Sequence, residues 1–326
     1  MRNTMNLNRR TALAAVAAFA VLSTPAYATD WPTKPVTIYV TTAAGGNTDI
    51  MARMAAEFLT AKFGKTFVVE NRPSAGGIQA TTQVVGAAPD GYTLLFTHSA
   101  AILLAPLVQK MPFDPDKRLT PVTNVGTGSQ VVAVKRSLPI SNLSEFLAYA
   151  KANPKKLNFA AAGTNNISHL APLLLFKRTG VEVVMVPSRG EPQAISDLVA
   201  GNVDFYFGNT SVLLAQREHP AIRLLAVGTG QRLATAPDLP TVSETVPGFV
   251  FASWNGFLVP NGTPNEIVAK LRGAIAEMVK EPKMSARLLS LGILPGGQSA
   301  EQVAAAYQND RRNFGEAVKA AGVPAP

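Results

Sequence analysis

Short apolar runs alternate along the chain with segments in which apolar residues recur every three or four positions. The runs predict buried strands, and the recurring pattern predicts amphipathic helices. The predicted strands are Val36–Thr41, Thr66–Glu70, Tyr92–Thr97, Val131–Lys135, Leu157–Ala161, Val181–Val186, Val203–Phe207 and Ile222–Val227. The predicted helix faces are Ile50/Met54/Phe58, Leu143/Phe146/Leu147/Ala150, Ala194/Leu198 and Ile267/Leu271/Ile275/Met278. This alternation indicates an α/β fold in which helices cover parallel sheets.

The first residues form a separate segment. Three arginines precede an unbroken apolar run, Ala12–Leu22, which ends at a proline-containing break and an A-x-A pattern at Ala26–Ala28. This pattern predicts a secretory signal peptide over residues 1–28 and therefore an exported mature protein. A membrane anchor is the alternative, but the run is far shorter than the ~20 residues that a bilayer needs.

Composition narrows the function classes. The chain of 326 residues is long enough for two ordinary domains after the signal peptide is removed. Its formal charge is +9, so removal of the three leader arginines leaves +6, and the remaining basic residues are scattered. Scattered charge favours attraction of anions over nucleic-acid binding. Because the sequence holds no cysteine, disulfides, thiolate metal sites and cysteine nucleophiles are excluded.

Two glycine-containing segments of the chain have similar sequence patterns. The stretches VTTAAGGNTDIMA (Val40–Ala52) and NFAAAGTNNISHLA (Asn158–Ala171) each read as a strand, a turn of small residues, a polar residue at the helix start, and a helix. Ligands of open α/β sheets bind beyond the carboxyl ends of strands, and helix N-termini favour anions. This similarity therefore predicts an anion cleft between two equivalent turns.

The sequence offers little for catalysis. His98, His169 and His219 are widely spaced and form no metal-binding pair. There is no G-x-S-x-G elbow, no phosphate loop, no phased dinucleotide motif and no evident acid–base pair of carboxylates. We therefore expect a binding protein without cofactor or metal, and an enzyme is the less favoured reading.

Several longer motifs follow one another along the chain: WPTKPV (Trp31–Val36), AAGGNTD (Ala43–Asp49), VVENRPSAGG (Val68–Gly77), APDGYTLL (Ala88–Leu95), FDPDKRLTPV (Phe113–Val122), AYAKANPKKLNF (Ala148–Phe159), AAGTNNISHLA (Ala161–Ala171), LVAGNVDFYF (Leu198–Phe207), DLPTVSE (Asp238–Glu244) and SWNGFLVPNGTP (Ser253–Pro264). In this order and spacing the chain resembles the periplasmic solute-binding receptors of tripartite tricarboxylate transporters, often called Bug-type receptors. Jointly the motifs are specific, although each alone is weak.

The resemblance implies a type II periplasmic-binding fold, with two α/β lobes around a ligand cleft. Residues 29–128 with 255–326 would form the first lobe, and residues 129–254 the second. In the family, backbone groups and ordered waters from two loops hold a ligand carboxylate, and those loops fall here at Ala43–Asn47 and Ala162–Asn166. The implied protein is a monomer that captures a small organic carboxylate for a membrane permease.

The residues expected to line the cleft belong to the two turns or to strand ends. Those at the turns are Thr42, Ala43, Ala44, Gly45, Gly46, Asn47, Asp49, Gly163, Thr164, Asn165, Asn166 and His169. Those at strand ends are Thr97, His98, Ser99, Ser188, Arg189, Asn209 and Thr210. Structural roles stay open for Asp49 as a helix cap and for His169 as a hydrogen-bonding partner of its own loop.

The ligand class stays open between aliphatic dicarboxylates or tricarboxylates, acidic amino acids and aromatic acids. Relatives commonly carry Tyr-Lys where this chain has Ser188-Arg189. An arginine fork holds a carboxylate in two hydrogen bonds, so the sequence favours a dicarboxylate, including a rigid aromatic one; an exposed, merely solubilising arginine is the alternative. A sensor that reports to a membrane kinase would need the same cleft, so this alternative also stays open.

Overall fold

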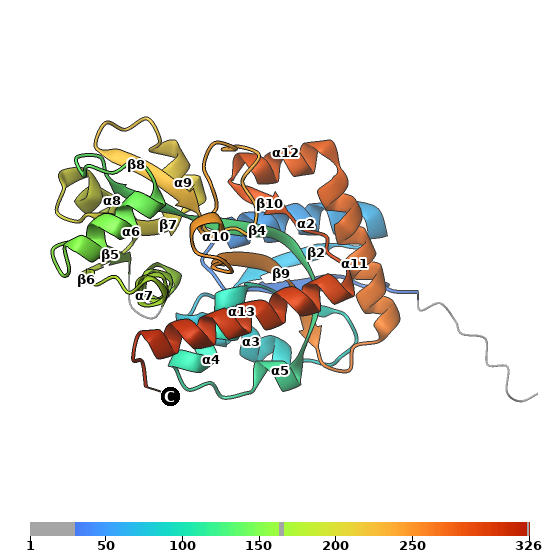
Figure 1. The fold of residues 1–326 in the computed structure, drawn as a ribbon. Coiled ribbons are helices and arrows are strands. Elements are labelled where there is room, and N and C mark those ends of the chain that lie inside the picture. Colours follow the sequence, from blue (N-terminus) through green and yellow to red (C-terminus); the bar gives the residue numbers. More distant parts are fainter. Residues whose placement is uncertain (1–29, 163–165, 325) are drawn as a thin grey trace, which may run out of the picture. The chain divides into compact units, whose positions relative to one another are not determined.

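The computed structural model describes residues 30–162, 166–324 and 326, so the predicted signal peptide lies outside the described residues. Residues 32–326 form one compact unit. It is a mixed β-sheet with helices packed on both of its sides (Figure 1). None of the helices in the described ranges has the length and apolarity required to cross a membrane.

The bounds of the elements follow chain order. The strands are β1 (Val36–Val40), β2 (Phe67–Asn71), β3 (Thr93–His98), β4 (Leu119–Lys135), β5 (Asn158–Ala162), β6 (Val184–Ser188), β7 (Phe205–Asn209), β8 (Ile222–Val227), β9 (Ala252–Pro260) and β10 (Ile293–Pro295). The longer helices are α2 (Asn47–Phe63), α3 (Ile78–Val85), α6 (Leu143–Ala152), α7 (Ile167–Thr179), α8 (Glu191–Ala200), α11 (Asn265–Lys280), α12 (Pro282–Ser290) and α13 (Ala300–Ala320). The short ones are η1 (Ala75–Gly77), η2 (Ala100–Leu104), α4 (Ala105–Val108), α5 (Pro115–Arg118), α9 (Thr210–Ala215) and α10 (Val242–Thr245).

The strand order is β2-β1-β3-β9-β4-β7-β5-β6, and β8 and β10 also pair with β4. The outer strands β1, β2 and β3 are mutually parallel, as are β5, β6 and β7. The expectation of purely parallel sheets is wrong at the centre, where β9 is antiparallel to β3 and β4, and β4 is antiparallel to β7. The reason is that β4 and β9 are long connections that cross between the two parallel groups, so they run against their neighbours.

Strand β4 changes partners partway along its length. Its residues up to Ser129 pair with β9, whereas Gln130 and the residues after it pair with β7 and β8. The partner change lies beside the predicted boundary between residues 128 and 129. The division into two lobes stays a prediction.

Aromatic packing supports the second parallel group of strands. The rings of Phe146, Phe176 and Phe205 come from α6, α7 and β7, and their centroids lie 5.1 to 6.5 Å apart. Such offset and edge-on contacts stabilise a core beyond simple area burial. Three of the four predicted helix faces are confirmed as inward faces, those of α6, α8 and α11. The face predicted in α2 is only partly right: Met54 is buried, but Ile50 and Phe58 are half-buried, and Met51, Ala55 and Leu59 are among the residues that α2 buries instead.

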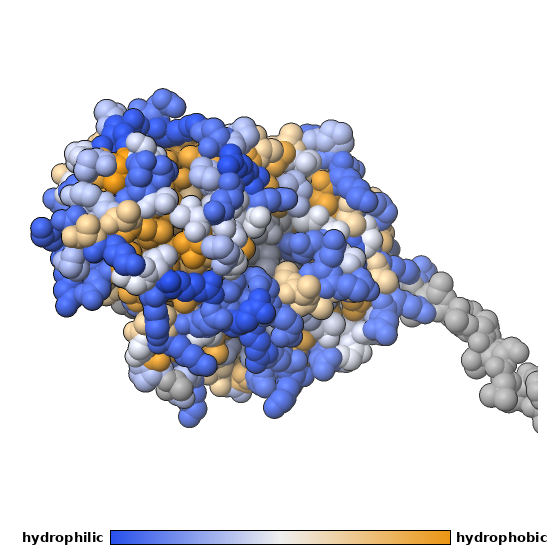
Figure 2. All heavy atoms as spheres, viewed as in Figure 1, coloured by the Kyte–Doolittle hydropathy of each residue, from blue (hydrophilic) through white to orange (hydrophobic). Residues whose placement is uncertain are grey.

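The last helix, α13, packs against both α7 and β4. Its buried residues include Tyr307, Phe314 and Val318, and the surface over this helix is largely hydrophilic in Figure 2. An amphipathic helix of this kind is stabilised mainly by burial of its apolar stripe. Helix α13 also contacts η2, which packs on β3, whereas α7 packs on β5 and β7, so α13 contacts helices from both sides of the β4 partner change.

Candidate functional site

The first turn connects β1 to α2 and leaves its backbone open. Residues 43–47 are exposed, and Gly46, rather than a polar residue, is the N-cap of α2. Gly45 has a φ of +87°, a conformation that favours glycine because it has no Cβ. The turn therefore presents the start of a helix, with its N–H groups, to solvent, which suits an anionic partner.

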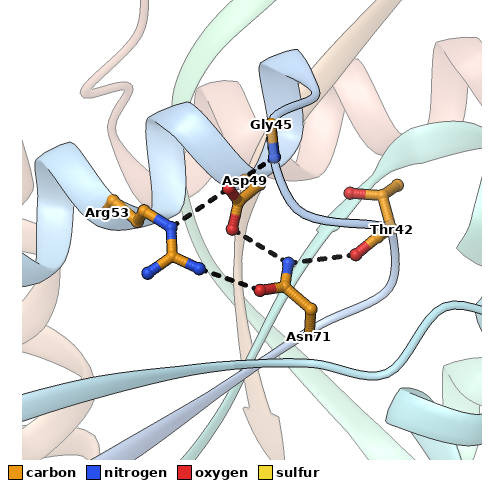
Figure 3. Close-up of polar contacts among 5 residues, drawn as sticks. All are labelled: Thr42, Gly45, Asp49, Arg53 and Asn71. Atoms are coloured by element: carbon orange, nitrogen blue, oxygen red, sulfur yellow. Dashed lines mark hydrogen bonds and ion pairs between the residues drawn. The ribbon is translucent and has the colours of Figure 1, made fainter.

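A buried carboxylate braces this turn from behind (Figure 3). Asp49 accepts hydrogen bonds from the backbone N–H of Gly45 at 2.9 Å, from Asn71 Nδ2 at 2.9 Å and from Arg53 Nε at 3.1 Å. Burial raises the pKa of Asp49, but these hydrogen bonds outweigh it, so the pKa is lowered overall. Asp49 is 2% exposed and is not among the described residues that line the cavities below, so its observed role is to hold the turn.

The second turn is organised by Asn166, the N-cap of α7. Its Nδ2 donates to the carbonyl of Ala162 at 2.7 Å, and its Oδ1 accepts from Ser168 Oγ at 2.8 Å and from the N–H of His169 at 3.2 Å. The predicted site residues Gly163, Thr164 and Asn165 lie outside the described residues. His169 is buried and outside the described cavity linings, and burial lowers the pKa of its imidazole.

Two cavities adjoin at these turns. We call the first, of about 540 Å³, the polar cavity; it is lined by Thr42, Asn47, Thr48, His98, Ala100, Gly128, Gln130, Ala162, Asn166, Ile167, Ser168, Glu191, Tyr206, Asn209, Ser211, Val212, Ser253 and Asn255. We call the second, of about 800 Å³, the side cavity; it is lined by Thr41, Thr42, Ala43, Pro73, Ser74, Gly76, Gly77, His98, Ala100, Ala101, Leu104, Ala105, Val108, Gln109 and Asn166. Both share Thr42, His98, Ala100 and Asn166, so the two turns and the end of β3 meet at one place.

Hydrogen-bonding groups surround the polar cavity. Thr48 Oγ1 donates to Asn255 Oδ1 at 2.7 Å, which links the start of α2 to β9. Gln130 Nε2 donates to Asn209 Oδ1 at 3.0 Å, which links β4 to the end of β7. The buried hydroxyl of Thr42 finds no hydrogen-bond partner among the described residues.

The polar cavity carries little formal charge on its described lining. No lysine or arginine is among the described residues that line it, and Glu191 is their one acidic side chain. Burial lowers the pKa of His98 to about 4, so at neutral pH its imidazole is uncharged, with one donor and one acceptor nitrogen. Groups of three or more potential metal ligands do not occur in the described parts of the chain. An anion bound here would be held by neutral donors.

The remaining predicted site residues lie around this junction. Thr97 is fully buried and its hydroxyl lies 3.0 Å from that of Thr41. Ser99 is also buried, with its Oγ 3.2 Å from that of the cavity residue Ser253. Residues with no place in the two described linings are Ala44, Gly45, Gly46, Asp49, Thr97, Ser99, His169, Ser188, Arg189 and Thr210. Ser188 and Thr210 are buried, whereas Arg189 is exposed.

Residues of the polar cavity that the sequence did not predict include Glu191, Gln130 and Asn255. Glu191 directly follows the Arg189-Gly190 pair, at the first position of α8. Its place after a strand and a glycine was an available signal. Gln130 lies in β4 and Asn255 in β9. The hydrophobic pattern predicted neither β9 nor the part of β4 that contains Gln130.

Known proteins share this fold. A solute-binding protein from Polaromonas, solved without ligand, superposes with a TM-score of 0.80 at 24% identity, over 89% of this chain and 99% of that one. The protein Rpa4515 of R. palustris, solved with adipate, matches with a TM-score of 0.74 at 32% identity over 91% and 99% of the two chains. MatC from Rhodopseudomonas palustris, with bound malate, matches with a TM-score of 0.69 at 32% identity over 88% and 100%.

The fold is therefore that of the periplasmic solute-binding proteins, as the resemblance implied. The sequence model of the tripartite tricarboxylate transporter family receptor matches residues 51–323, and the chain belongs to that family. Among curated relatives, a UPF0065 protein of Bordetella bronchiseptica is 32% identical over 96% of this chain and 93% of its own length. Receptors of this family bind small carboxylates and work with tripartite transporters.

Proposed function

We propose that this protein is a periplasmic receptor that captures a small organic carboxylate and delivers it to a tripartite permease. The observation that carries the proposal is the junction of the two turns, where Thr42, His98 and Asn166 face both cavities. Neutral donors at such a junction bind a carboxylate through hydrogen bonds, and bridging waters serve nearly as well as direct contacts. A site without a fixed cation suits a receptor that must release its cargo.

Two related proteins bear on the ligand class. Adipate and malate are both dicarboxylates, and their presence in these proteins puts dicarboxylates among the candidate ligands here. Arg189 adds no support for a dicarboxylate, because this side chain is exposed and outside the described linings. The ligand panel must therefore include monocarboxylates, dicarboxylates and amino acids.

Thermal unfolding of the mature protein against this panel tests the binding function. A ligand present at 100 times its dissociation constant stabilises the folded state by about 2.7 kcal/mol, which raises the midpoint by several degrees. Titration calorimetry then gives the affinity. If no small carboxylate shifts the midpoint, the binding function is wrong.

Delivery to a permease is tested by uptake of the labelled ligand in cells that carry a tripartite permease, with and without the receptor gene. Uptake that depends on the receptor supports transport, whereas receptor-dependent signalling without uptake would favour a sensor for a membrane kinase. Conversion of the ligand on prolonged incubation would favour an enzyme. We expect a monomer in solution, which light scattering checks.

A further inference from the structure

We propose that Glu191 sets the ligand specificity of the polar cavity, by favouring carboxylates that also carry an ammonium group over dicarboxylates. This inference rests on the proposed carboxylate-binding function and names the ligand class for it. The ligand carboxylate would lie at the junction of Thr42, His98 and Asn166, and the ammonium group would point toward Glu191.

The carboxylate of Glu191 is fixed in place by three donors. Its Oε1 accepts from the backbone N–H of Asn209 at 2.7 Å and from the hydroxyl of Tyr206 at 3.3 Å, and its Oε2 accepts from Asn209 Nδ2 at 2.6 Å. Helix α8, which begins with Glu191, packs against β7, which carries both partners (Figure 1). The side chain is therefore oriented before any ligand arrives.

Within the described part of the chain, this carboxylate keeps room for one more donor. Each oxygen of an ionised carboxylate accepts about two hydrogen bonds, and the three contacts occupy both positions of Oε1 and one of Oε2. Glu191 also lines the polar cavity, so the remaining position is accessible to a ligand. A hydrogen-bond donor on the ligand fits this position, and a charged donor fits it best.

The charge of the site points the same way. Glu191 is the one acidic side chain among the described residues that line the polar cavity, and no lysine or arginine is among them. A second ligand carboxylate beside Glu191 would therefore be repelled, with no positively charged side chain in this lining to offset the repulsion. An ammonium group would instead be attracted in a partly desolvated site. The polar cavity thus combines several neutral hydrogen-bonding groups with one anionic acceptor among its described lining residues.

A purely structural role for Glu191 makes a different prediction. If the side chain only holds Asn209 in place, its loss would weaken all ligands by a similar factor. If it contacts the ligand, its neutralisation changes the ratio of affinities between ligands. The ratio is therefore the decisive quantity.

The test compares matched acids that differ only in the group at the far end. Pentanoate, 5-hydroxypentanoate, 5-aminopentanoate and pentanedioate form one such series, and the four-carbon and six-carbon series cover other lengths. Calorimetry gives their dissociation constants for the natural protein and for Glu191→Gln, which keeps the shape and an acceptor oxygen but removes the charge. Glu218→Gln is the matched control, because the Glu218 side chain is 97% exposed.

For the natural protein we expect the amino acid of the best-fitting length to bind at least about tenfold more tightly than its dicarboxylate, a difference of about 1.4 kcal/mol. Glu191→Gln should reduce this ratio to about threefold or less, and Glu218→Gln should leave it unchanged. Tighter binding of the dicarboxylate by the natural protein, or an unaltered ratio in Glu191→Gln, would overturn the inference while leaving carboxylate binding intact. If no acid of any length binds, the proposed function fails and the inference with it.

Discussion

The Asp49 carboxylate accepts a hydrogen bond from the backbone N–H of Gly45, with 2.9 Å between Oδ2 and the nitrogen. A residue inside α2 therefore fixes the turn that precedes the same helix. Asn71 extends this brace, because its Nδ2 donates to Asp49 Oδ1 and also to the carbonyl of Thr42 at 3.0 Å (Figure 3). The turn at the cavity junction is thus held by a polar network behind it.

Asp49→Asn should lower the free energy of unfolding by about 1–3 kcal/mol, because buried donors lose a charged acceptor. Since the pKa of Asp49 is lowered in the folded state, its ionised form stabilises the protein above the ordinary aspartate pKa, and this stability is lost as the pH falls through the lowered value. The variant should therefore lose less stability than the natural protein between about pH 5 and pH 2. Urea titrations at several pH values measure this difference. Glu57→Gln, on an exposed position of α2, is the control and should follow the natural protein.

Gly46→Val tests whether the first turn contacts the ligand. A Cβ at Gly46 would meet only the carbonyl oxygen of Ala43, at 3.8 Å, so the variant should fold normally. The added side chain would stand at the exposed start of α2 and should weaken binding of the cognate acid at least about tenfold. Calorimetry that returns the natural affinity would remove the first turn from the binding site.

Gly45→Ala should affect stability rather than ligand binding. No heavy atom of the described residues lies within 4 Å of the Cβ position, but the φ of +87° disfavours any residue with a Cβ. We expect a loss of about 1 kcal/mol in stability from backbone strain. Thermal unfolding of both variants separates this strain from the steric effect at Gly46.

Ligand binding should draw the two predicted lobes together, with bending near Ser129 and Ala252, where β4 and β9 end their pairing. Small-angle scattering should then give a smaller radius of gyration for the saturated receptor. The same measurement on Gly46→Val, at ligand concentrations that saturate only the natural protein, gives the unliganded reference. Superimposable curves with and without bound ligand would argue against large closure.

Asp310 on α13 should make the protein less stable as the pH rises. Burial raises its pKa to about 7, and a hydrogen bond from Trp254 offsets only part of this effect. Because the folded state holds this proton more tightly than the unfolded state, the contribution of Asp310 to stability is most favourable below about pH 4, falls between about pH 4 and pH 7, and is level above. Asp310→Asn should remove this slope and stabilise the protein at pH 8 by on the order of 2–4 kcal/mol. Denaturant titrations at pH 5 and pH 8 measure the free energy of unfolding of the natural protein and of Asp310→Asn. If this free energy changes with pH equally in both proteins, the proton belongs to another group.

The hydrophobic pattern located the strands of the two parallel groups within a few residues, because buried strands there form short, separate apolar runs. It recovered only the end of β4 and missed β9, since both strands carry glycine and polar residues where they cross, as in Gly126, Gly128 and Gly256. Gly256 shows why: a Cβ there would lie 2.5 Å from the carbonyl oxygen of Thr123. The close approach of the two backbones requires glycine, and a glycine interrupts the apolar run from which a strand is predicted.

The candidate site was also predicted only in part. Thr42, Asn47, His98, Asn166 and Asn209 follow strands or end them, and the rule for ligand sites in α/β sheets placed them beside one cavity. Their contact with a ligand stays a prediction. Glu191 was overlooked because its meaning depends on Asn209 and Tyr206, which come next to it only in the folded chain.

The separation of basic residues from the cavities has a kinetic consequence. Without the three arginines of the predicted signal peptide the formal charge is +6, yet no lysine or arginine is among the described residues that line either cavity. The positive exterior attracts anions over a distance that dissolved salt shortens, whereas departure from the cavity breaks no ion pair with a base. Rising ionic strength should therefore slow the capture of an anionic solute while leaving its rate of escape nearly constant.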